Sequence, residues 1–252
     1  MTAASRGSGI AVITGAAGGM GSYIARRLHA EGRKVLLTDI ASDAVEALAA
    51  ELSKDGSTAI AVSMDVAERD EFVSVLDRCR QTWGVPTIVV NNAAVTQAAD
   101  LMTLRQADFT RVLSTNVNSI FFGCQVFGAA MAEQGFGRII NMASLAGQNG
   151  GSATGGHYAS SKGAILTATK VFAKELAARG VTVNAVAPGP HDLPVVKATV
   201  PPEKLESIVA GIPVRTLGDP AFIADVVALL AADSASFVTG ACWDVNGGLY
   251  MR

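Results

Sequence analysis

Residues 10–21 of the chain read IAVITGAAGGMG. The apolar run Ile10–Ile13 predicts a buried strand, and a helix-like spacing of apolar residues follows the glycines. Gly15, Gly19 and Gly21 allow a tight turn in which backbone N–H groups approach a phosphate, at the positive end of a helix. Their Gly-x-x-x-Gly-x-Gly spacing differs from the commonest dinucleotide fingerprint, but it can serve the same purpose. We expect a pyrophosphate-binding loop here; the alternative is a plain strand–turn–helix of small residues.

A second strand is expected at Lys34–Thr38, and it ends at Asp39. Asp39 lies 18 residues after Gly21. An acidic residue about 20 residues beyond such a loop accepts hydrogen bonds from an adenosine ribose, and it repels a 2′-phosphate. No Lys or Arg stands between Gly15 and Gly21 to neutralise that phosphate. These residues favour NAD over NADP, unless Asp39 is only a strand-end carboxylate in a turn.

Tyr158 and Lys162 stand four residues apart, so on a helix they project from one face. A phenol with a pKa of about 10 is a poor base at neutral pH, and a nearby cation lowers that pKa. The hydroxyl of Ser144, brought near this pair, could hold a carbonyl or hydroxyl oxygen of a substrate. Together the three side chains would form a proton-transfer site. The pair alone is a weak signal, because the same spacing is common on ordinary surface helices.

Strand and helix patterns alternate along the chain, which is typical of a parallel sheet with helices on both faces. We predict a Rossmann-type, doubly wound α/β fold with seven strands in a single domain over residues 1–252. Besides the two strands above, the others are expected at Ala59–Val62, Thr87–Val90, Arg138–Met142, Val181–Val186 and near Ala241–Val245. Helices are expected near Ser42–Lys54, Glu68–Trp83, Leu104–Gln134, Tyr158–Arg179, Pro202–Ala210 and Pro220–Ala231. The segment Gly147–Gly156 is expected to be a flexible loop.

Composition argues against several classes of protein. Of 252 residues, half are apolar, and 20 basic residues nearly balance 22 acidic ones, so no basic stripe indicates nucleic acid. Cys79, Cys124 and Cys242 show no metal or redox spacing, and we expect no metal. The stretch Met1–Gly9 has no apolar core typical of a secretory signal, and no apolar run approaches the roughly 20 residues that span a bilayer. We therefore expect a soluble, cytoplasmic protein.

With these residues in view, the chain resembles a short-chain dehydrogenase/reductase of the roughly 250-residue type, from about Gly9 to Gly248. Further matching motifs are Asp65-Val66, Asn91-Asn92-Ala93-Ala94, Thr115-Asn116-Val117, Pro188-Gly189 and Asp244-Val245-Asn246-Gly247-Gly248. The resemblance implies a catalytic tetrad of Asn116, Ser144, Tyr158 and Lys162. It also implies cofactor contacts from Gly15, Ala17, Gly19, Met20, Gly21, Asp39, Ile40, Asp65, Val66, Asn92, Ala93, Ala94, Tyr158, Lys162, Pro188 and Gly189.

In this family the tetrad interconverts a secondary alcohol and a ketone with a nicotinamide cofactor, and the resemblance implies the same roles here. Tyr158 would be the acid/base, and Lys162 would lower its pKa and hold the nicotinamide ribose. Ser144 would orient the substrate oxygen. Asn116 would disrupt its own helix and hold a water that links Lys162 to solvent. We expect an NAD-dependent oxidoreductase acting on CH–OH groups.

Two positions depart from the family pattern. Ala94 replaces a glycine on the nicotinamide side. Leu193 stands where many relatives have a threonine that binds the carboxamide, so Asp192 or a backbone group would have to substitute. His191, in the loop after Gly189, could touch substrate. His157, next to Tyr158, is expected to point away from the helix face that carries Tyr158. The segment near 190–212 is interpreted as a substrate lid with several apolar residues.

The substrate stays open at this point. The chain is similar to 3-oxoacyl-(acyl-carrier-protein) reductases, but those usually use NADPH, which Asp39 disfavours. They also present two basic residues to the acidic carrier; Arg179 matches one, while Gly135 occupies the other position. We favour a secondary alcohol, a hydroxyacyl thioester or a polyol as substrate. The alternatives are the carrier-protein reductase and, in a different class, a non-catalytic dinucleotide-binding protein.

The sequence also indicates that several copies of the chain associate. The helix that starts near Tyr158 carries small residues over three turns, which let another helix approach closely. The long segment Leu104–Gln134 carries apolar residues on more than one face, so it needs a second partner. Together with the family resemblance, these features predict a homotetramer, with a dimer as the second choice.

Overall fold

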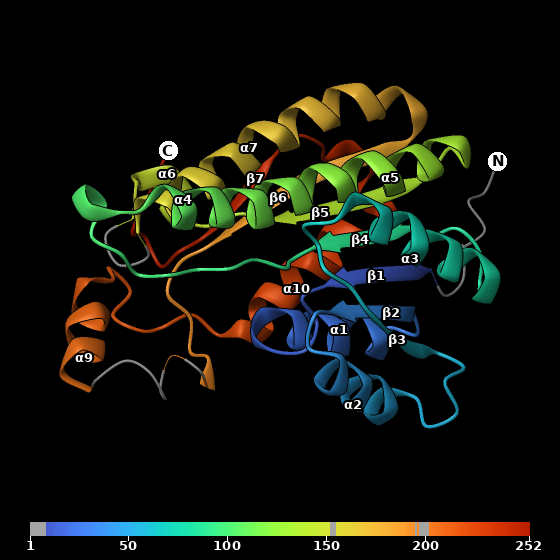
Figure 1. Cartoon of the computed structure of the whole chain (residues 1–252), viewed down its shortest axis with the longest axis horizontal. Coiled ribbons are helices and arrows are strands. Elements are labelled where there is room, and N and C mark those ends of the chain that lie inside the picture. The colour runs from blue at the N-terminus through green and yellow to red at the C-terminus, as the bar shows by residue number, and fades with distance from the viewer. Residues whose placement is uncertain (1–8, 152–154, 195, 197–201) are drawn as a thin grey trace.

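The computed structural model describes residues 9–151, 155–194, 196 and 202–252 (Figure 1). Seven strands form one parallel sheet in the order β3-β2-β1-β4-β5-β6-β7. Their bounds are β1 Ile10–Thr14, β2 Lys34–Asp39, β3 Ala59–Ser63, β4 Ile88–Asn91, β5 Gly137–Met142, β6 Val181–Pro188 and β7 Cys242–Val245. Because the chain runs outward from β1 in one direction and then from β4 in the other, the strand order reverses between them. The predicted doubly wound seven-stranded sheet is confirmed.

Helices cover both faces of this sheet (Figure 1). One face packs against α1 (Gly19–Ala30), α2 (Ser42–Leu52) and α10 (Pro220–Ala231). The other packs against α3 (Arg69–Thr82), α5 (Ser119–Glu133) and α7 (Gly156–Leu176). Every predicted helix is present, with ends that differ by a few residues. Among the described residues, no helix is both long enough and apolar enough to cross a bilayer.

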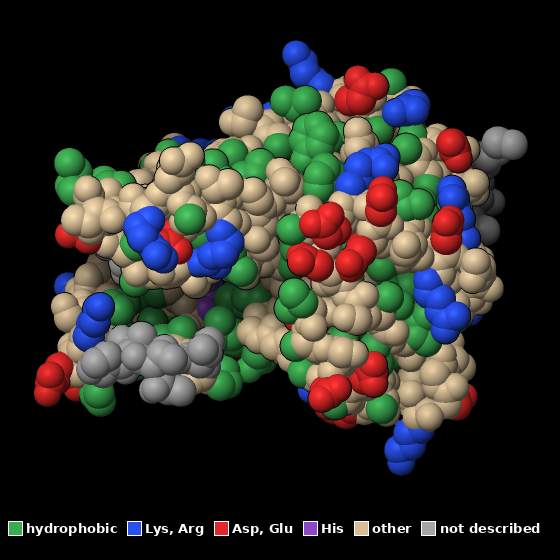
Figure 2. Space-filling model, viewed as in Figure 1, with side chains coloured by type: hydrophobic (Ala, Val, Ile, Leu, Met, Phe, Trp, Pro, Cys, Tyr) green, Lys and Arg blue, Asp and Glu red, His purple; other side chains and the backbone are tan. Residues whose placement is uncertain are grey.

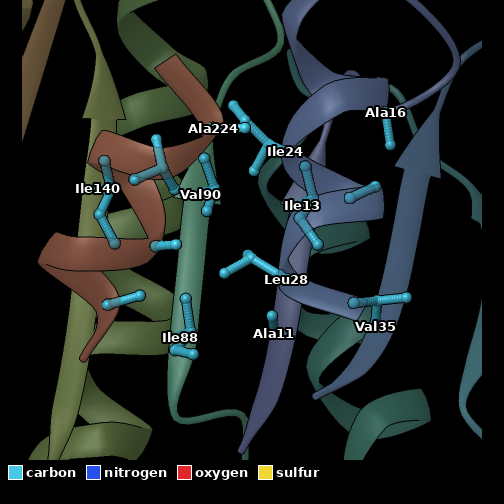
Figure 3. Packing of buried hydrophobic residues seen from close by; sticks show 14 of the residues in the cluster. Ala11, Ile13, Ala16, Ile24, Leu28, Val35, Ile88, Val90, Ile140 and Ala224 are labelled. Carbon is cyan, nitrogen blue, oxygen red and sulfur yellow. The ribbon is translucent and has the colours of Figure 1, made fainter. Parts of the chain in front are cut away.

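The core forms two layers because side chains alternate across each strand. Ile13 belongs to the layer under α1 and α10, whereas its neighbour Val12 belongs to the layer under α3 and α5. Figure 3 shows Ile24 and Leu28 of α1 lying together with Ile13 and Val90 of the adjacent strands β1 and β4. Each such fully buried side chain contributes about 1.5–3 kcal/mol to folding. This packing fixes the position of the loop between β1 and α1.

The long helix predicted over Leu104–Gln134 is interrupted. It consists of α4 (Gln106–Leu113), a π-helical stretch (Ser114–Asn118) and α5. A π-helical stretch adds a residue to one turn and rotates the side chains that follow. Asn116 lies inside it, so the local disruption expected at this residue is present.

The glycine-rich segment expected to be a loop is partly helical. A four-residue helix, α6 (Ala146–Asn149), follows β5, and α7 begins at Gly156, two residues earlier than expected. Gly147 lets α6 lie directly on α7, because a Cβ there would stand 2.5 Å from the carbonyl carbon of Lys162. A helix forms here instead of the expected loop because the contact with α7 overrides the poor helix propensity of glycine. Residues 152–154 of the expected loop lie outside the described residues.

The segment interpreted as a lid is described only in part. It includes α9 (Pro202–Gly211), which has no buried residue, while the next residue, Ile212, is buried. Val195 and Val200 of the expected lid lie outside the described residues. The role of this segment therefore stays a prediction.

Candidate active site

A cavity of about 930 Å³ opens at the carboxyl ends of the strands, beside the point where the strand order reverses. Open α/β sheets bind ligands at this place. Figure 2 shows a hollow at this end of the molecule, between α4 and α9, with hydrophobic side chains in its wall. Of the expected cofactor residues, those that line the cavity are Gly15, Ala17, Gly19, Met20, Asp39, Ile40, Asp65, Val66, Asn92, Ala93 and Ala94. Gly21, Tyr158, Lys162, Pro188 and Gly189 are not in this lining.

Close packing requires the glycines of the β1–α1 loop. Gly15 adopts a left-handed backbone (φ 65°), and a Cβ at Gly21 would stand 2.1 Å from the carbonyl oxygen of Gly15. The segment after β4 holds the loop in place: Asn92 Nδ2 donates to the carbonyl oxygens of Thr14 (3.0 Å) and Gly15 (2.9 Å). In return, the Thr14 hydroxyl accepts from the backbone N–H of Ala93 at 3.1 Å. The Asn92 side chain thus shapes the loop, which its sequence motif did not reveal.

The start of α1 is suited to an anion. Its N-cap residue is Gly18, so no capping side chain accepts from the first N–H groups of the helix. The first turn also carries no acidic residue that would repel an anion. Nothing lies within 4 Å of a Cβ placed on Gly18 or Gly19, and both residues line the cavity. Unsatisfied N–H groups at a helix N-terminus bind phosphate readily. The residues present therefore fit the pyrophosphate of a dinucleotide.

Asp39 ends β2 at the cavity wall and is held by two backbone donors. Its Oδ2 accepts from the N–H of Ala17 at 2.9 Å, and its Oδ1 accepts from the N–H of Ala41 at 3.1 Å. Ile40 beside it is 71% exposed. Among the described residues, Arg111 is the one cation in the cavity lining, and its guanidinium donates to the side chain of Gln97. Asp39 thus presents a fixed negative charge with acceptor capacity left on both oxygens.

Tyr158, Lys162 and Ser144 come together near the end of β5, outside the lining of this cavity. Lys162 Nζ lies 5.5 Å from the centre of the Tyr158 ring and donates to the carbonyl oxygen of Met142 at 2.6 Å. The side chain of Ser144 hydrogen-bonds with the Tyr158 phenol. Ser144 also accepts from the N–H of Ala146 at 3.1 Å, which begins α6. The three groups that the sequence suggested are thus neighbours.

The electrostatics of this group are dominated by burial. Burial raises the pKa of the Tyr158 phenol, and the hydrogen bond with Ser144 opposes that rise only in part. Burial lowers the pKa of Lys162 from 10.5 to about 8. Burial thus sets the direction of both shifts, since loss of water disfavours the charged form of each group. The lowering of the Tyr158 pKa by Lys162 stays a prediction.

Asn116 is fully buried and joins two segments of the site. Its Oδ1 accepts from the N–H of Val95 at 2.8 Å, and its Nδ2 donates to the carbonyl oxygen of Val95 at 2.9 Å. Nδ2 also donates to the hydroxyl of Ser161 at 3.0 Å, and Ser161 in turn donates to the carbonyl oxygen of Tyr158 at 2.7 Å. Asn116 thereby connects the π-helical stretch with α7. Its expected role in holding a water stays a prediction.

Gly189 and His191, both noted in the sequence, lie in the segment that follows β6. The N–H of Gly189 donates to the carbonyl oxygen of Val245 at 2.8 Å. His191 is buried, and its Nδ1 donates to the carbonyl oxygen of Gly189 at 2.8 Å. Burial lowers the pKa of His191, so the ring is neutral near pH 7. Contact of His191 with substrate, and the group that substitutes for the threonine replaced by Leu193, stay predictions.

Sequence reasoning missed a buried polar network beside the site. Asn91 Nδ2 donates to Asn141 Oδ1 at 2.9 Å, and Asn141 Nδ2 donates to the Thr169 hydroxyl at 3.0 Å. Gly123 makes room for it, because a Cβ there would stand 2.1 Å from Asn91 Oδ1. The network ties β4, β5 and α7 together. His157 is also buried, and among the described residues neither of its ring nitrogens has a hydrogen-bond partner.

The cysteines and possible metal ligands add no further chemistry to this site. Cys79, Cys124 and Cys242 are free thiols, and burial raises the pKa of Cys79 and Cys124 to about 12. Within the described ranges, no group of three or more His, Cys, Asp or Glu side chains is placed to hold a metal ion.

Comparison with known proteins gives one consistent result. A family model described as enoyl-(acyl carrier protein) reductase matches residues 15–250. The 3-oxoacyl-(acyl-carrier-protein) reductase FabG of Escherichia coli K12 is 35% identical over 244 residues, covering 96% of this chain and 97% of that protein. The FabG of Pseudomonas aeruginosa is also 35% identical, over 242 residues, with the same coverage.

A solved structure agrees with this result. A short-chain dehydrogenase/reductase from Brucella melitensis, described as glucose/ribitol dehydrogenase, superposes with a TM-score of 0.90 at 30% identity, covering 98% of this chain and 99% of that one. The chain belongs to the short-chain dehydrogenase/reductase family. It is an oxidoreductase that acts on CH–OH groups with a nicotinamide dinucleotide.

Proposed function

We propose that this protein interconverts a secondary alcohol and a ketone with NAD(H), and that Tyr158 is the acid/base. The observation that carries the proposal is the grouping of Tyr158, Lys162 and Ser144 at the carboxyl ends of the strands, where a dinucleotide-sized cavity opens. The β1–α1 loop would hold the pyrophosphate and Asp39 the adenosine ribose. The bound cofactor supplies or accepts the hydride.

The protein's own residues then handle the proton. The raised pKa of Tyr158 keeps its phenol protonated at neutral pH, so Tyr158 Oη is ready to donate a proton to a ketone oxygen. The Ser144 hydroxyl, already bonded to that phenol, is placed to hold the same oxygen. In the direction of alcohol oxidation, Tyr158 must first lose its proton. Oxidation should therefore speed up as pH rises, whereas reduction should slow down.

Lys162 and Asn116 are proposed to support this transfer. Lys162 is anchored on the carbonyl oxygen of Met142 and faces the Tyr158 ring, so it stabilises the phenolate that forms in reduction. Asn116 fixes the start of α7 through Ser161. The contacts of Pro188 and Gly189 with the nicotinamide end belong to the same proposal, as do the other cofactor contacts expected from the sequence.

The cofactor preference rests on Asp39. We expect Asp39→Ala to weaken NAD binding and to reduce the preference for NAD over NADP by about 10-fold or more, because the repulsion of a 2′-phosphate disappears. The control is Asp43→Ala, which removes an exposed carboxylate nearby on α2. The ratio of kcat/KM for the two cofactors should change only in the first variant. A higher kcat/KM with NADP than with NAD in the unmodified protein would refute the proposal.

The substrate class can be tested directly. Purified protein is assayed in both directions with small ketones and alcohols, polyols, hydroxyacyl thioesters and a 3-oxoacyl thioester on a carrier protein. We expect turnover with a free small molecule or thioester. The FabG relatives keep the carrier-bound substrate as the second candidate. The exposed Arg179 supports carrier binding, but the second basic residue is replaced by Gly135. Binding of NADH without turnover of any compound would favour the non-catalytic alternative.

We also propose a homotetramer built from one dinucleotide-binding domain per chain. Phe121 of α5 is 45% exposed and stacks edge-on against Phe172 of α7, with Val171 exposed beside it. A second exposed apolar group consists of Phe222 and Leu229 on α10 and Phe237 after it. Two such groups on different helices support two separate contacts between subunits. The cytoplasmic location expected from the sequence stays a prediction.

Light scattering at micromolar concentration measures the assembly. We expect four times the chain mass of 25.8 kDa. Replacing Phe121 by Glu should disrupt one contact and give dimers, whereas Ala44→Glu, at an exposed position on α2, should leave the mass unchanged. A mass of one chain in the unmodified protein would contradict any assembly, and twice that mass would contradict the tetramer alone.

A further inference from the structure

We propose that Arg252, Asp244 and Gln148 form a clamp that positions helix α6, and through it Ser144 and Lys162. The inference rests on the proposed function, because it assigns these residues an effect on the same site. Gln148 on α6 precedes Asp244 on β7 by 96 residues, whereas Arg252 follows Asp244 by only eight.

The clamp is centred on the carboxylate of Asp244, whose side chain on β7 is 19% exposed. Arg252 binds it with two parallel hydrogen bonds, Nε to Oδ2 and Nη2 to Oδ1, both at 2.8 Å. Gln148 Nε2 donates to Oδ1 at 2.5 Å. These bonds hold the pKa of Asp244 below its usual value although burial acts to raise it. A two-pronged arginine–carboxylate pair is both stronger and more directional than a single contact.

Helix α6 depends on such a support. It has only four residues, and an isolated helix of that length is not stable. Ser144, two residues before its first residue, accepts from the N–H of Ala146 at 3.1 Å. Asp244 holds Gln148, two residues further along this helix. A shift of Gln148 would therefore be passed along one helical turn to Ser144.

The residue before Gln148, Gly147, lies against the backbone of Lys162. A Cβ on Gly147 would stand 2.5 Å from the carbonyl carbon of Lys162 and 2.7 Å from the nitrogen of Gly163. With no spare space in this contact, α6 cannot move toward α7. The clamp holds the side chain of the adjacent residue, Gln148. The two contacts together fix α6, and with it Ser144, relative to the backbone of Lys162.

Loosening the clamp should misplace Ser144 without removing any group that touches substrate or cofactor. A displacement of about 1 Å can cost on the order of 10²-fold in rate. Because α7 still holds Lys162, we expect a smaller effect, a decrease in kcat of about 10-fold. The affinity for NADH should change less than kcat, because the β1–α1 loop and Asp39 lie on the other side of the sheet's switch point from β7.

The test compares Arg252→Gln and Gln148→Met, which open the clamp at its two ends, with Arg26→Gln as the matched control. Arg26 makes a similar two-pronged pair with Glu51 on the surface, away from the site. Hydrogen exchange at residues 145–149 should become faster in both clamp variants and not in the control. Both variants should lose kcat, and the double variant should lose no more than either one, because the same clamp is already open. Arg252→Lys, which keeps one bond, should fall in between.

The outcomes separate the clamp from the reaction. Unchanged exchange at residues 145–149 in Arg252→Gln would overturn the clamp. Faster exchange with an unchanged kcat and an unchanged pH profile would overturn its positioning role. If the unmodified protein turned over no substrate, the proposed function would fail. The exchange comparison would then still decide whether the clamp exists.

Discussion

Tyr158→Phe is expected to lower kcat by on the order of 10²–10⁴-fold, the usual contribution of a positioned acid/base. The substitution removes one hydroxyl and leaves the ring, so the packing of α7 on α4 should remain. The affinity for NADH should change little, since the β1–α1 loop and Asp39, which line the cavity, are left intact. Steady-state rates and NADH fluorescence titration, made on the same preparation, measure both quantities.

The control is Tyr23→Phe, the same chemical change on α1, where the phenol is outside the site. It should leave kcat within about 2-fold of the unmodified protein. Full activity of Tyr158→Phe with NADH still bound would rule out Tyr158 as the proton donor. Another group in contact with the substrate oxygen would then have to donate the proton.

Lys162→Met should have the second largest effect, a loss of activity on the order of 10²-fold together with greater stability of the protein without cofactor. The pKa of Lys162 falls from 10.5 to about 8 on burial, which corresponds to a destabilisation of about 3 kcal/mol at neutral pH. The lost bond to the carbonyl oxygen of Met142 offsets about 1 kcal/mol of this. Methionine is apolar and of similar length, so the net gain should be about 1–2 kcal/mol.

The sign of the pH dependence follows from the same pKa. Because folding lowers the pKa of Lys162, the unfolded chain binds more protons between about pH 8 and pH 10.5. In that window the contribution of Lys162 to stability rises with pH, and below about pH 8 its penalty is constant. The advantage of Lys162→Met over the unmodified protein should therefore be present at neutral pH and should shrink above pH 8.

Urea unfolding at about pH 7 and about pH 9.5 measures this difference. Lys170→Met, on the exposed face of the same helix, is the control and should change stability by less than about 0.5 kcal/mol. A Lys162→Met variant that is less stable at neutral pH would show that the charged lysine is better paired than its burial indicates. Retained activity would show that Tyr158 works without it.

Much of the fold could be predicted from local patterns. The apolar runs at Ile10–Ile13 and Val35–Leu37 identify buried strands, because a parallel strand covered on both faces has no polar side. The glycine loop and Asp39 are predictable for the same reason: backbone geometry and ribose recognition depend on a few residues at fixed spacing. The grouping of Ser144 with Tyr158 follows once the strands are known to be parallel, since their carboxyl ends share one edge.

Other features depend on contacts that no local pattern contains. The raised pKa of Tyr158 reflects burial by the whole site, and sequence reasoning considered only the charge of Lys162. Helix α6 exists because Gly147 lies against α7, although its residues are poor helix formers. Asn92 belongs to a family motif, yet its side chain supports the β1–α1 loop. The clamp joins Gln148, Asp244 and Arg252, whose separation along the chain shows no periodicity.

The central claim is direct hydride exchange between NADH and a ketone carbon at the Tyr158 site. Its most direct measurement uses NADH deuterated on the nicotinamide ring, incubated with the protein and the ketone panel, followed by mass spectrometry of the products. We expect one deuterium on the carbinol carbon of at least one product. This product should form faster from deuterated NADH than from deuterated NADPH. Its formation should be greatly slowed in Tyr158→Phe. Products without deuterium, no product from any ketone, or faster transfer from NADPH would contradict it.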